Sequence, residues 1–285
     1  MNTKLFFSKN FLLVILFVFA FVSYPVFSQD DKVEDYSWEN ENDNTEQKTP
    51  YFALSFGANA SFLFMKYDDI NHKPLPGSLS WKELLDKEFS GPMISYGFNF
   101  FTALSPLVNN ARLGVSYQNG SRAIESTTSA TYSGGTEELQ KSNVFRSISV
   151  QATGVHFDYA IVPIKSLAIL PGLGVKFGSM TLEQYITFDA PRWDLKQDKL
   201  SIANSFNEKL EYAFCAVEPQ INIEYAITSF LMFRASASYM LTVDNPFYKN
   251  AWTINGDNTY SGVPKSVKPQ GFSVSAGLYI GLFNY

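Results

Sequence analysis

The stretch GFSVSAGLYIGLFNY, from Gly271 to Tyr285, alternates between large apolar residues and small or polar ones. A period of two residues predicts a β-strand with one apolar face. Such a strand needs a neighbour on each side, because an unpaired edge exposes backbone hydrogen-bonding groups. The segment from Tyr51 to Met65 shows the same alternation. We therefore expect these two strands to pair antiparallel and close a barrel. The apolar face of the quoted stretch consists of Phe272, Val274, Ala276, Leu278, Ile280 and Leu282.

Alternating segments recur along the whole chain after Tyr51. In two of them the apolar residues change from one parity to the other, near Thr153 and at Val217. Each change predicts a β-bulge, in which one extra residue is inserted into a strand. Together the segments predict a closed antiparallel transmembrane β-barrel of about eight strands. The six additional segments are residues 94–100, 111–118, 148–161, 167–178, 212–225 and 231–241.

The composition favours a membrane barrel over a soluble domain. Charged residues make up 17% of the chain, whereas about 25% is typical of soluble domains. The mean hydropathy of −0.07 argues against a helical membrane protein, and alternating strands hide their apolar residues from such an average. The net charge of −5 gives no basis for nucleic-acid binding. The single cysteine, Cys215, excludes an internal disulfide, and we expect no metal or other cofactor.

Two segments precede the barrel. Residues 1–28 combine early lysines with an apolar run and a small residue at the end, which predicts a secretory signal peptide. The alternative is a membrane-anchoring helix, for which the run is short against the roughly 20 residues needed. Residues 29–50 are polar and acidic, and they predict a disordered periplasmic lead-in. The barrel itself is expected to span residues 51–285.

The connections between the predicted strands alternate in length. In outer-membrane barrels the periplasmic turns are short and the external loops are longer. The order found here places both termini in the periplasm of a Gram-negative bacterium and four loops outside. Asn119-Gly120 fits a tight hairpin turn, but the residues after it are polar, and an extended strand with a glycine kink fits equally well. The long connections are residues 67–91, 119–142, 190–207 and 244–270, and the short ones are 103–110, 163–166 and 226–229.

Two loops carry local signals. Ser80-Trp-Lys-Glu83 is a capping box, and the apolar residues up to Phe89 follow helical spacing. We expect a short helix there, in the first extracellular loop. Asn255-Gly256 predicts a tight hairpin turn in the fourth loop.

The second face of the strands consists mostly of Gly, Ser, Ala and Asn, with a few charges. A lipocalin-like barrel in water would place its polar face outside, and that face would carry a denser set of charges. The sparse, balanced charges predict a narrow, filled lumen instead. They form either a structural network of mutually neutralising groups or a gated path for ions or protons. The predicted lumen residues are Arg112, His156, Asp158, Lys176, Glu218, Glu224 and Arg234.

Catalytic chemistry has little support in the sequence. The chain has two histidines, of which His72 lies in a polar loop. His156 and Asp158 share a strand face and could orient a general base. However, no G-x-S-x-G or H-E-x-x-H motif accompanies them. We therefore predict no catalytic residues.

The loops are the best candidates for function. Trp81, Trp193 and Trp252 are candidate contacts with an external partner, although packing within folded loops is an equal alternative. The leading hypothesis is a binding, structural or accessory protein of the envelope, acting through its extracellular loops. The alternatives are a small passive channel and an outer-membrane lipid-modifying enzyme. The expected partners are outer-membrane lipids and an envelope protein.

The segment FDYAIVPIKSLAILPGLGVKFG, from Phe157 to Gly178, resembles the central hairpin of the PorT-like outer-membrane β-barrel family of Bacteroidota, a group of small OmpX-like barrels. In that family an apolar strand ends in Ile-Pro or Val-Pro, here Val162-Pro163, and a Gly-rich strand returns. Cleavage before Gln29 is also similar to exported proteins of Bacteroidota. The resemblance implies that a C-terminal aromatic residue, here Tyr285, is recognised by the barrel-insertion machinery.

Overall fold

The structure is a computed structural model, and it describes most of the chain from Tyr51 onward. All structural statements below concern this part of the chain. The described residues are 51–72, 87–104, 107–131, 139–187, 205–243, 252–254, 256, 258–260 and 263–284. The predicted signal peptide and acidic lead-in lie outside them.

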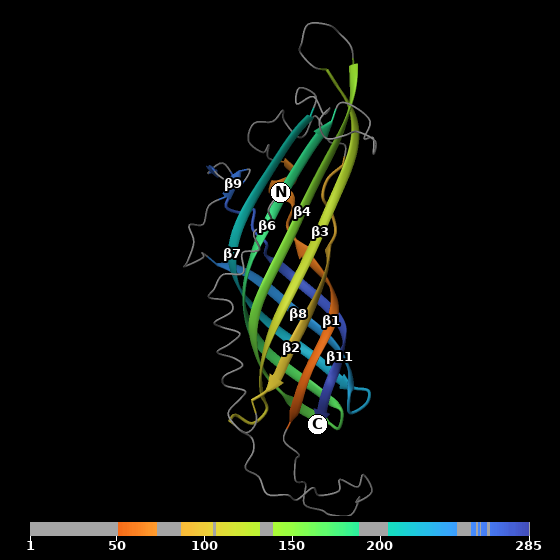
Figure 1. The fold of residues 1–285 in the computed structure, drawn as a ribbon, viewed down its shortest axis with the longest axis vertical. Helices are drawn as coiled ribbons and strands as arrows, with labels where there is room; N and C mark the ends of the chain where they lie inside the picture. Colours follow the sequence, from red (N-terminus) through yellow and green to blue (C-terminus); the bar gives the residue numbers. More distant parts are fainter. Residues whose placement is uncertain are drawn as a thin grey trace, which may run out of the picture. The chain divides into compact units, whose positions relative to one another are not determined.

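Eight antiparallel strands close into a barrel, as predicted. Each strand pairs with the next, and the last returns to the first (Figure 1). The closing register pairs Leu54 with Leu282 and Phe64 with Phe272, so the predicted pairing of the two quoted stretches is confirmed. The barrel strands are β1 (Phe52–Met65), β2 (Met93–Ala103), β3 (Ala111–Thr131), β4 (Leu139–Tyr159), β6 (Leu167–Thr187), β7 (Ser205–Ala226), β8 (Leu231–Val243) and β11 (Gly271–Asn284).

The remaining elements are short. Strand β5 (Ile161–Ile164) extends the β4 side of the sheet along β6. Strands β9 (Trp252–Ile254) and β10 (Asn258–Tyr260) form a hairpin at the place predicted from Asn255-Gly256, and Gly256 has a φ of 90°. Strand β9 also pairs with β7.

The first long connection holds one short helix, α2 (Asp68–His72). It lies in the predicted loop but before the predicted segment, most of which falls outside the described residues. Within the described part of the chain, no helix is long and apolar enough to cross a membrane.

The two ends of the barrel differ in their connections. At one end, here called the turn end, β1 begins, β11 ends and the connections are short, such as residues 104–110 and 227–230. At the other end, the loop end, β3, β4, β6 and β7 continue beyond β1 and β2 (Figure 1). Three connections there are long, residues 66–92, 188–204 and 244–270. The fourth, residues 132–138, joins β3 to β4 in seven residues, so most of the predicted long connection 119–142 is strand instead. The residues after Asn119 are therefore an extended strand, the second of the two structures that the sequence allowed.

Around the barrel, the outward side chains form an apolar belt. No outward position from Phe52 to Phe64 on β1, or from Phe272 to Leu282 on β11, holds Asp, Glu, Lys or Arg. Soluble proteins rarely expose apolar patches of more than a few hundred Å², so this wall suits lipid. The large belt side chains are between 37% and 69% exposed: Phe52, Leu54, Phe56, Phe62, Phe64, Ile94, Tyr96, Phe98, Phe100, Val115, Val155, Phe157, Tyr159, Leu173, Phe177, Ile221, Ile223, Tyr225, Phe233, Tyr239, Leu241, Phe272, Leu278, Ile280 and Leu282.

The predicted β-bulges near Thr153 and at Val217 are wrong. The register of β4 with β3 and β6 runs without a shift through Thr153, and that of β7 with β6 does so through Val217. On β4, Ile148 and His156 both point inward although one is apolar and the other polar. The strand therefore does not change face. Instead, its inward face changes from polar to apolar residues toward the loop end, and its outward face changes from apolar to polar residues.

Both faces change chemistry at about the same level. Tyr117, Thr153 and Phe177 form one row of partners, and the next outward row toward the loop end is Asn119, Gln151 and Ser179. Between these two rows lies one inward row, at which the interior begins to change from polar to apolar. It consists of Gln118, Ala152, Gly178 and Phe214. Beyond this level the outer face is polar and suits contact with water. The inner face is apolar, so other parts of the protein must pack against it.

Those partners come from the long connections. The loop-end core joins inward residues of β4, β6 and β7, such as Ile148, Met180 and Phe214, to loop residues Ile70, Phe89 and Val267. Polar contacts fix the loops over this core. The Asn71 side chain donates to the Phe89 carbonyl and accepts from its N–H, both at 2.9 Å. Arg146 Nη2 donates to the Ile70 carbonyl at 2.9 Å. The loop end is therefore filled by its own connections.

A pair of cysteines can test the closure of the barrel. Ala60 and Ala276 lie directly opposite each other on β1 and β11, and both point outward. Opposed residues have Cβ atoms about 4.5–5.5 Å apart. The variant Ala60→Cys with Ala276→Cys should form a disulfide on mild oxidation, seen as faster migration of the denatured chain on a non-reducing gel.

The matched control combines Ala60→Cys with Ala235→Cys. Ala235 is the β8 partner of Ala276 and so lies two strands from Ala60. That separation, about 10 Å, is too great for a disulfide. Cross-linking in the control but not in the first variant would contradict the register.

Candidate functional site

The lumen is filled in layers, and its middle is polar. At the turn end an apolar layer lies across it, including Tyr51, Phe101, Leu170, Met232 and Tyr279. At the loop end lies the core described above. Between them, inward positions of the strands carry charged and amide side chains that are almost entirely buried. These side chains form two clusters, each held together by hydrogen bonds and ion pairs. Together the two clusters are the candidate site.

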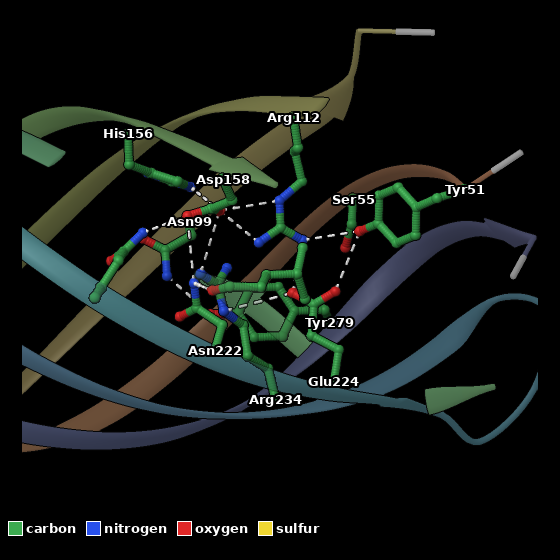
Figure 2. A network of polar contacts seen from close by, with 12 residues as sticks. Tyr51, Ser55, Asn99, Arg112, His156, Asp158, Asn222, Glu224, Arg234 and Tyr279 are labelled. Carbon is green, nitrogen blue, oxygen red and sulfur yellow. Dashed lines mark hydrogen bonds and ion pairs between the residues drawn. The ribbon is translucent and has the colours of Figure 1, made fainter. Parts of the chain in front are cut away.

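The first, the charged cluster, consists of Arg112, His156, Asp158, Glu224 and Arg234. Arg112 donates to two carboxylates: Nη2 lies 2.6 Å from Asp158 Oδ2, and Nη1 lies 2.6 Å from Glu224 Oε1 (Figure 2). Arg234 lies 3.5 Å from Glu224 Oε1 through Nε and 3.8 Å from Asp158 Oδ2 through Nη2. The strand register explains this geometry, because Arg112 is opposite Asp158 and Glu224 is opposite Arg234.

Neutral groups complete the coordination of the carboxylates. The Tyr51 hydroxyl donates to Glu224 Oε2 at 3.3 Å and accepts from Arg112 Nη1 at 3.1 Å. Gln220 Nε2 and Asn222 Nδ2 both donate to Asp158 Oδ1, at 2.7 and 3.4 Å. Each buried carboxylate therefore has a charged partner and at least one neutral donor, which is what a buried ion needs in order to be tolerated.

Aromatic rings support the arginines from the turn end. The Arg112 guanidinium lies 4.0 Å from the Phe101 ring centroid. Arg234 lies 5.5 Å from the same ring and 5.7 Å from the ring of Tyr279. These distances fall within the range of cation–π attraction. The two rings thus join the charged cluster to the apolar layer beneath it.

The second, the polar cluster, lies toward the loop end. Lys176 Nζ is 2.6 Å from Glu218 Oε2 and donates to Gln118 Oε1 at 3.1 Å. Ser238 Oγ donates to Glu218 Oε1 at 2.9 Å. Gln118 Nε2 donates to the hydroxyls of Ser95 and Ser61, at 2.7 and 2.9 Å. Hydrogen bonds therefore link β1, β2, β3, β6, β7 and β8 across the lumen.

Two inward glycines make room for the charged cluster. A Cβ atom at Gly172 would overlap Asp158 Oδ1, and one at Gly114 would overlap the His156 ring. In contrast, a Cβ at Gly174 would meet only ordinary contacts. The space for buried charges is thus provided at particular positions and not by every glycine of the Gly-rich strand.

The structure places all seven predicted lumen residues inside the barrel and links them in the two clusters. The predicted set did not include Tyr51, Gln118, Gln220 or Asn222, which belong to the same clusters. The parity of these four residues matches that of the inward faces, so the pattern itself could have indicated them. What it could not show is which of many inward polar residues meet across the lumen.

Of the three tryptophans predicted as loop contacts, the structure describes one, Trp252. Trp252 is buried in the loop-end core, where its ring stacks on Tyr212 at a centroid distance of 5.2 Å. Of the two roles considered for it, this is packing within the folded loops. Trp81, Trp193 and Tyr285 lie outside the described residues. Within the described ranges, no group of three His, Cys, Asp or Glu side chains could hold a metal ion.

Comparisons with known proteins return barrels of the outer membrane. No protein-family model and no curated protein sequence matches the chain. Ail of Yersinia pestis is 8% identical over 82% of this chain and 99% of that one, with a TM-score of 0.37. A major outer membrane protein of Thermus thermophilus is 10% identical over 80% and 99%, with a TM-score of 0.43. CarO of Acinetobacter baumannii is 11% identical over 82% and 98%, with a TM-score of 0.30. Since these scores are below 0.5, the fold rests on the strand pairing described above.

Removing Arg112 should destabilise the barrel strongly. The variant Arg112→Met would leave Asp158 and Glu224 buried with weaker compensation, and breaking a buried ion pair on one side costs about 3–5 kcal/mol. The matched control is Lys209→Met. Lys209 pairs with Glu211 at the surface, and both side chains are about half exposed, at 46% and 39%. That pair should contribute less than about 1 kcal/mol.

The measurement is reversible unfolding in urea in lipid or detergent, followed by tryptophan fluorescence and by the heat-dependent gel shift of barrels. Equal unfolding midpoints for the two variants would show that the charged cluster contributes little to stability.

Proposed function

We propose that this chain is an integral outer-membrane protein of a Gram-negative bacterium, with both termini of the barrel in the periplasm. Its role is to bind a partner of the cell envelope through the part that extends beyond the membrane. The observation that carries this proposal is the extension itself: β3, β4, β6 and β7 continue past the apolar belt as a sheet with its own core. A barrel that served only as a membrane plug would not need it.

The membrane location is supported by the belt and by the reversal of the strand faces. On β3, β4 and β6 the apolar wall ends at the row of Tyr117, Thr153 and Phe177, although these strands continue beyond it. The predicted signal peptide, residues 1–28, is consistent with export. The resemblance to PorT-like proteins, the recognition of Tyr285 by the insertion machinery and the acidic lead-in, residues 29–50, stay predictions.

The filled lumen argues against a channel. An open pore needs a continuous aqueous path, but apolar layers cross the lumen at both ends of the polar middle. The ions in that middle are paired with one another at short distances. This arrangement supports the structural network rather than the gated path.

The position of His156 and Asp158 argues against lipid chemistry. His156 Nε2 lies 3.6 Å from Asp158 Oδ2, but both side chains are buried in the lumen between the two apolar layers. A phospholipid or lipid A molecule would approach from the belt, on the opposite face of the same strand. The pair is thus placed for the charged cluster and not for a membrane substrate.

The most suitable binding surface is the free edge of β3. Its pairing with β2 ends at Ser121, and no described strand pairs with residues 122–131 on that side. An edge of ten residues offers over 30 Å of backbone donors and acceptors. At the other side of the extension, β9 covers part of the β7 edge. Among the described residues, one edge is therefore partly covered and the other has no strand partner, so that a strand of a partner protein can be added there.

Arginine substitutions at matched alanines test the membrane location. Ala235 points outward within the belt on β8, whereas Ala213 points outward on β7 just beyond it. Ala235→Arg should cost about 2–4 kcal/mol, and Ala213→Arg should cost about 0–1 kcal/mol, because the cost of a lipid-facing charge depends on depth. Unfolding in lipid vesicles would measure both. Equal effects would place the belt outside a membrane.

Paired proline substitutions test the β3 edge. Neighbouring residues of an antiparallel strand direct their N–H groups to opposite sides. Of Thr127→Pro and Thr128→Pro, one therefore removes an N–H from the open edge and the other an N–H from the β4 side, where residues 127 and 128 face Asn143 and Ser142. The variant that removes an N–H from the open edge should keep the folded barrel and lose the bound partner.

The measurement is native purification of the full chain in mild detergent, with identification of co-purifying envelope proteins. A partner that stays bound to both proline variants, or a monomer that carries none, would contradict binding through this edge.

A further inference from the structure

A polar cavity lies in the lumen between the charged cluster and the polar cluster. It is lined by Asn59, His156, Lys176 and Arg234 together with a row of serines, of which Ser236 and Ser275 are opposed partners on β8 and β11. Its volume is about 50 Å³. One enclosed water needs roughly 10–15 Å³, so the cavity holds about three to five species of that size.

Arg234 has hydrogen-bonding capacity that its neighbours do not use. Its side chain is 4% exposed, and Nη1 has no hydrogen-bond partner. Nε makes only the 3.5 Å ion pair with Glu224 and no hydrogen bond. A buried guanidinium donor without a partner is costly, so an acceptor in the adjoining cavity would stabilise it.

The carboxylates around the cavity are already committed to other donors. Glu218 accepts from Lys176 and Ser238, while Glu224 accepts from Arg112 and Tyr51. The remaining unpartnered atoms at the cavity are Arg234 donors, His156 Nε2 and the Asn59 and Asn222 Oδ1 atoms. The serine hydroxyls can rotate to donate. The group that most needs a partner is therefore Arg234, which needs a negatively charged acceptor. The amide oxygens can accept hydrogen bonds from water.

We propose that the cavity binds one small monovalent anion of the halide class, held by Arg234 Nη1 and by hydroxyls of the serine row. A divalent anion such as sulfate is disfavoured because Arg112 and Lys176 are paired with carboxylates, so that no cation is left to balance a second negative charge. A cation is disfavoured because the nearby carboxylates are committed and Arg234 and Lys176 line the wall. The site is independent of the β3 edge and does not depend on the proposed function.

The experiment uses the full chain, purified in detergent and crystallised with sodium bromide. The site predicts an anomalous bromine peak in the cavity, within hydrogen-bond distance of Arg234 Nη1. Independently, the unfolding temperature should be about 2–4 °C higher in chloride than in gluconate at equal ionic strength, since a ligand that binds only the folded state stabilises it.

Two variants and a control sharpen the test. Arg234→Met removes the charged donor, and Ser236→Val with Ser275→Val fills the cavity without changing any charge. Both should abolish the chloride effect. Arg122→Met is the matched control, because Arg122 lies away from the cavity and donates to the Pro92 carbonyl at 2.6 Å; it should keep the effect. If only water occupies the cavity in bromide crystals, or if the chloride effect persists in the Ser236→Val, Ser275→Val variant, the proposal is wrong.

Discussion

The closure of the sheet is the constraint on which the rest of this structure depends. In lipid no water can satisfy an open strand edge, so a sheet with an apolar outer wall must have every backbone group paired within the wall. The pairing of β1 with β11, from Phe52 with Asn284 to Met65 with Gly271, meets this requirement over the full length of both strands. Where β3 leaves the belt, its edge is free of strand partners among the described residues. In the part of the chain that the structure describes, the edge is thus paired within the belt, where lipid cannot hydrogen-bond to it, and has no strand partner beyond the belt, where water can.

A second consequence of the surroundings is the exchange of strand faces. Within the belt, the apolar face meets lipid, so the lumen takes the polar residues. Beyond the belt, the outer face meets water and carries residues such as Gln151, Lys209 and Glu211. The apolar residues then occupy the inner face, where loop residues such as Phe89 and Val267 must cover them. One continuous strand such as β4 therefore serves two environments without a shift of register.

This exchange also marks the limit of what the sequence could predict. Alternation identified the barrel strands, the closing pair and the inward charges, because each depends on parity within one environment. The same parity rule misinterpreted Thr153 and Val217 as bulges, since a change of surroundings produces the same pattern as an inserted residue. It could not show that Trp252 stacks on Tyr212, because that contact joins strands brought together by the fold. Which inward residues meet across the lumen, such as Arg112 and Glu224, likewise depends on the barrel's width and stagger.

The buried charges are best understood through register. The inward faces of β8, β11 and β1 hold mostly small residues such as Ser236, Ser275 and Ser61, which would fit equally well after a slip of two residues. Such a slip keeps every side chain on its correct face, so the apolar belt does not oppose it. The opposed pairs Arg112–Asp158 and Arg234–Glu224 oppose such a slip between β3 and β4 and between β7 and β8. A two-residue slip between β3 and β4 would place Arg112 opposite His156 or Ala160, leaving Asp158 buried without its partner. At about 3–5 kcal/mol for a broken buried pair, the charged cluster distinguishes the native register from alternatives that the belt alone would accept.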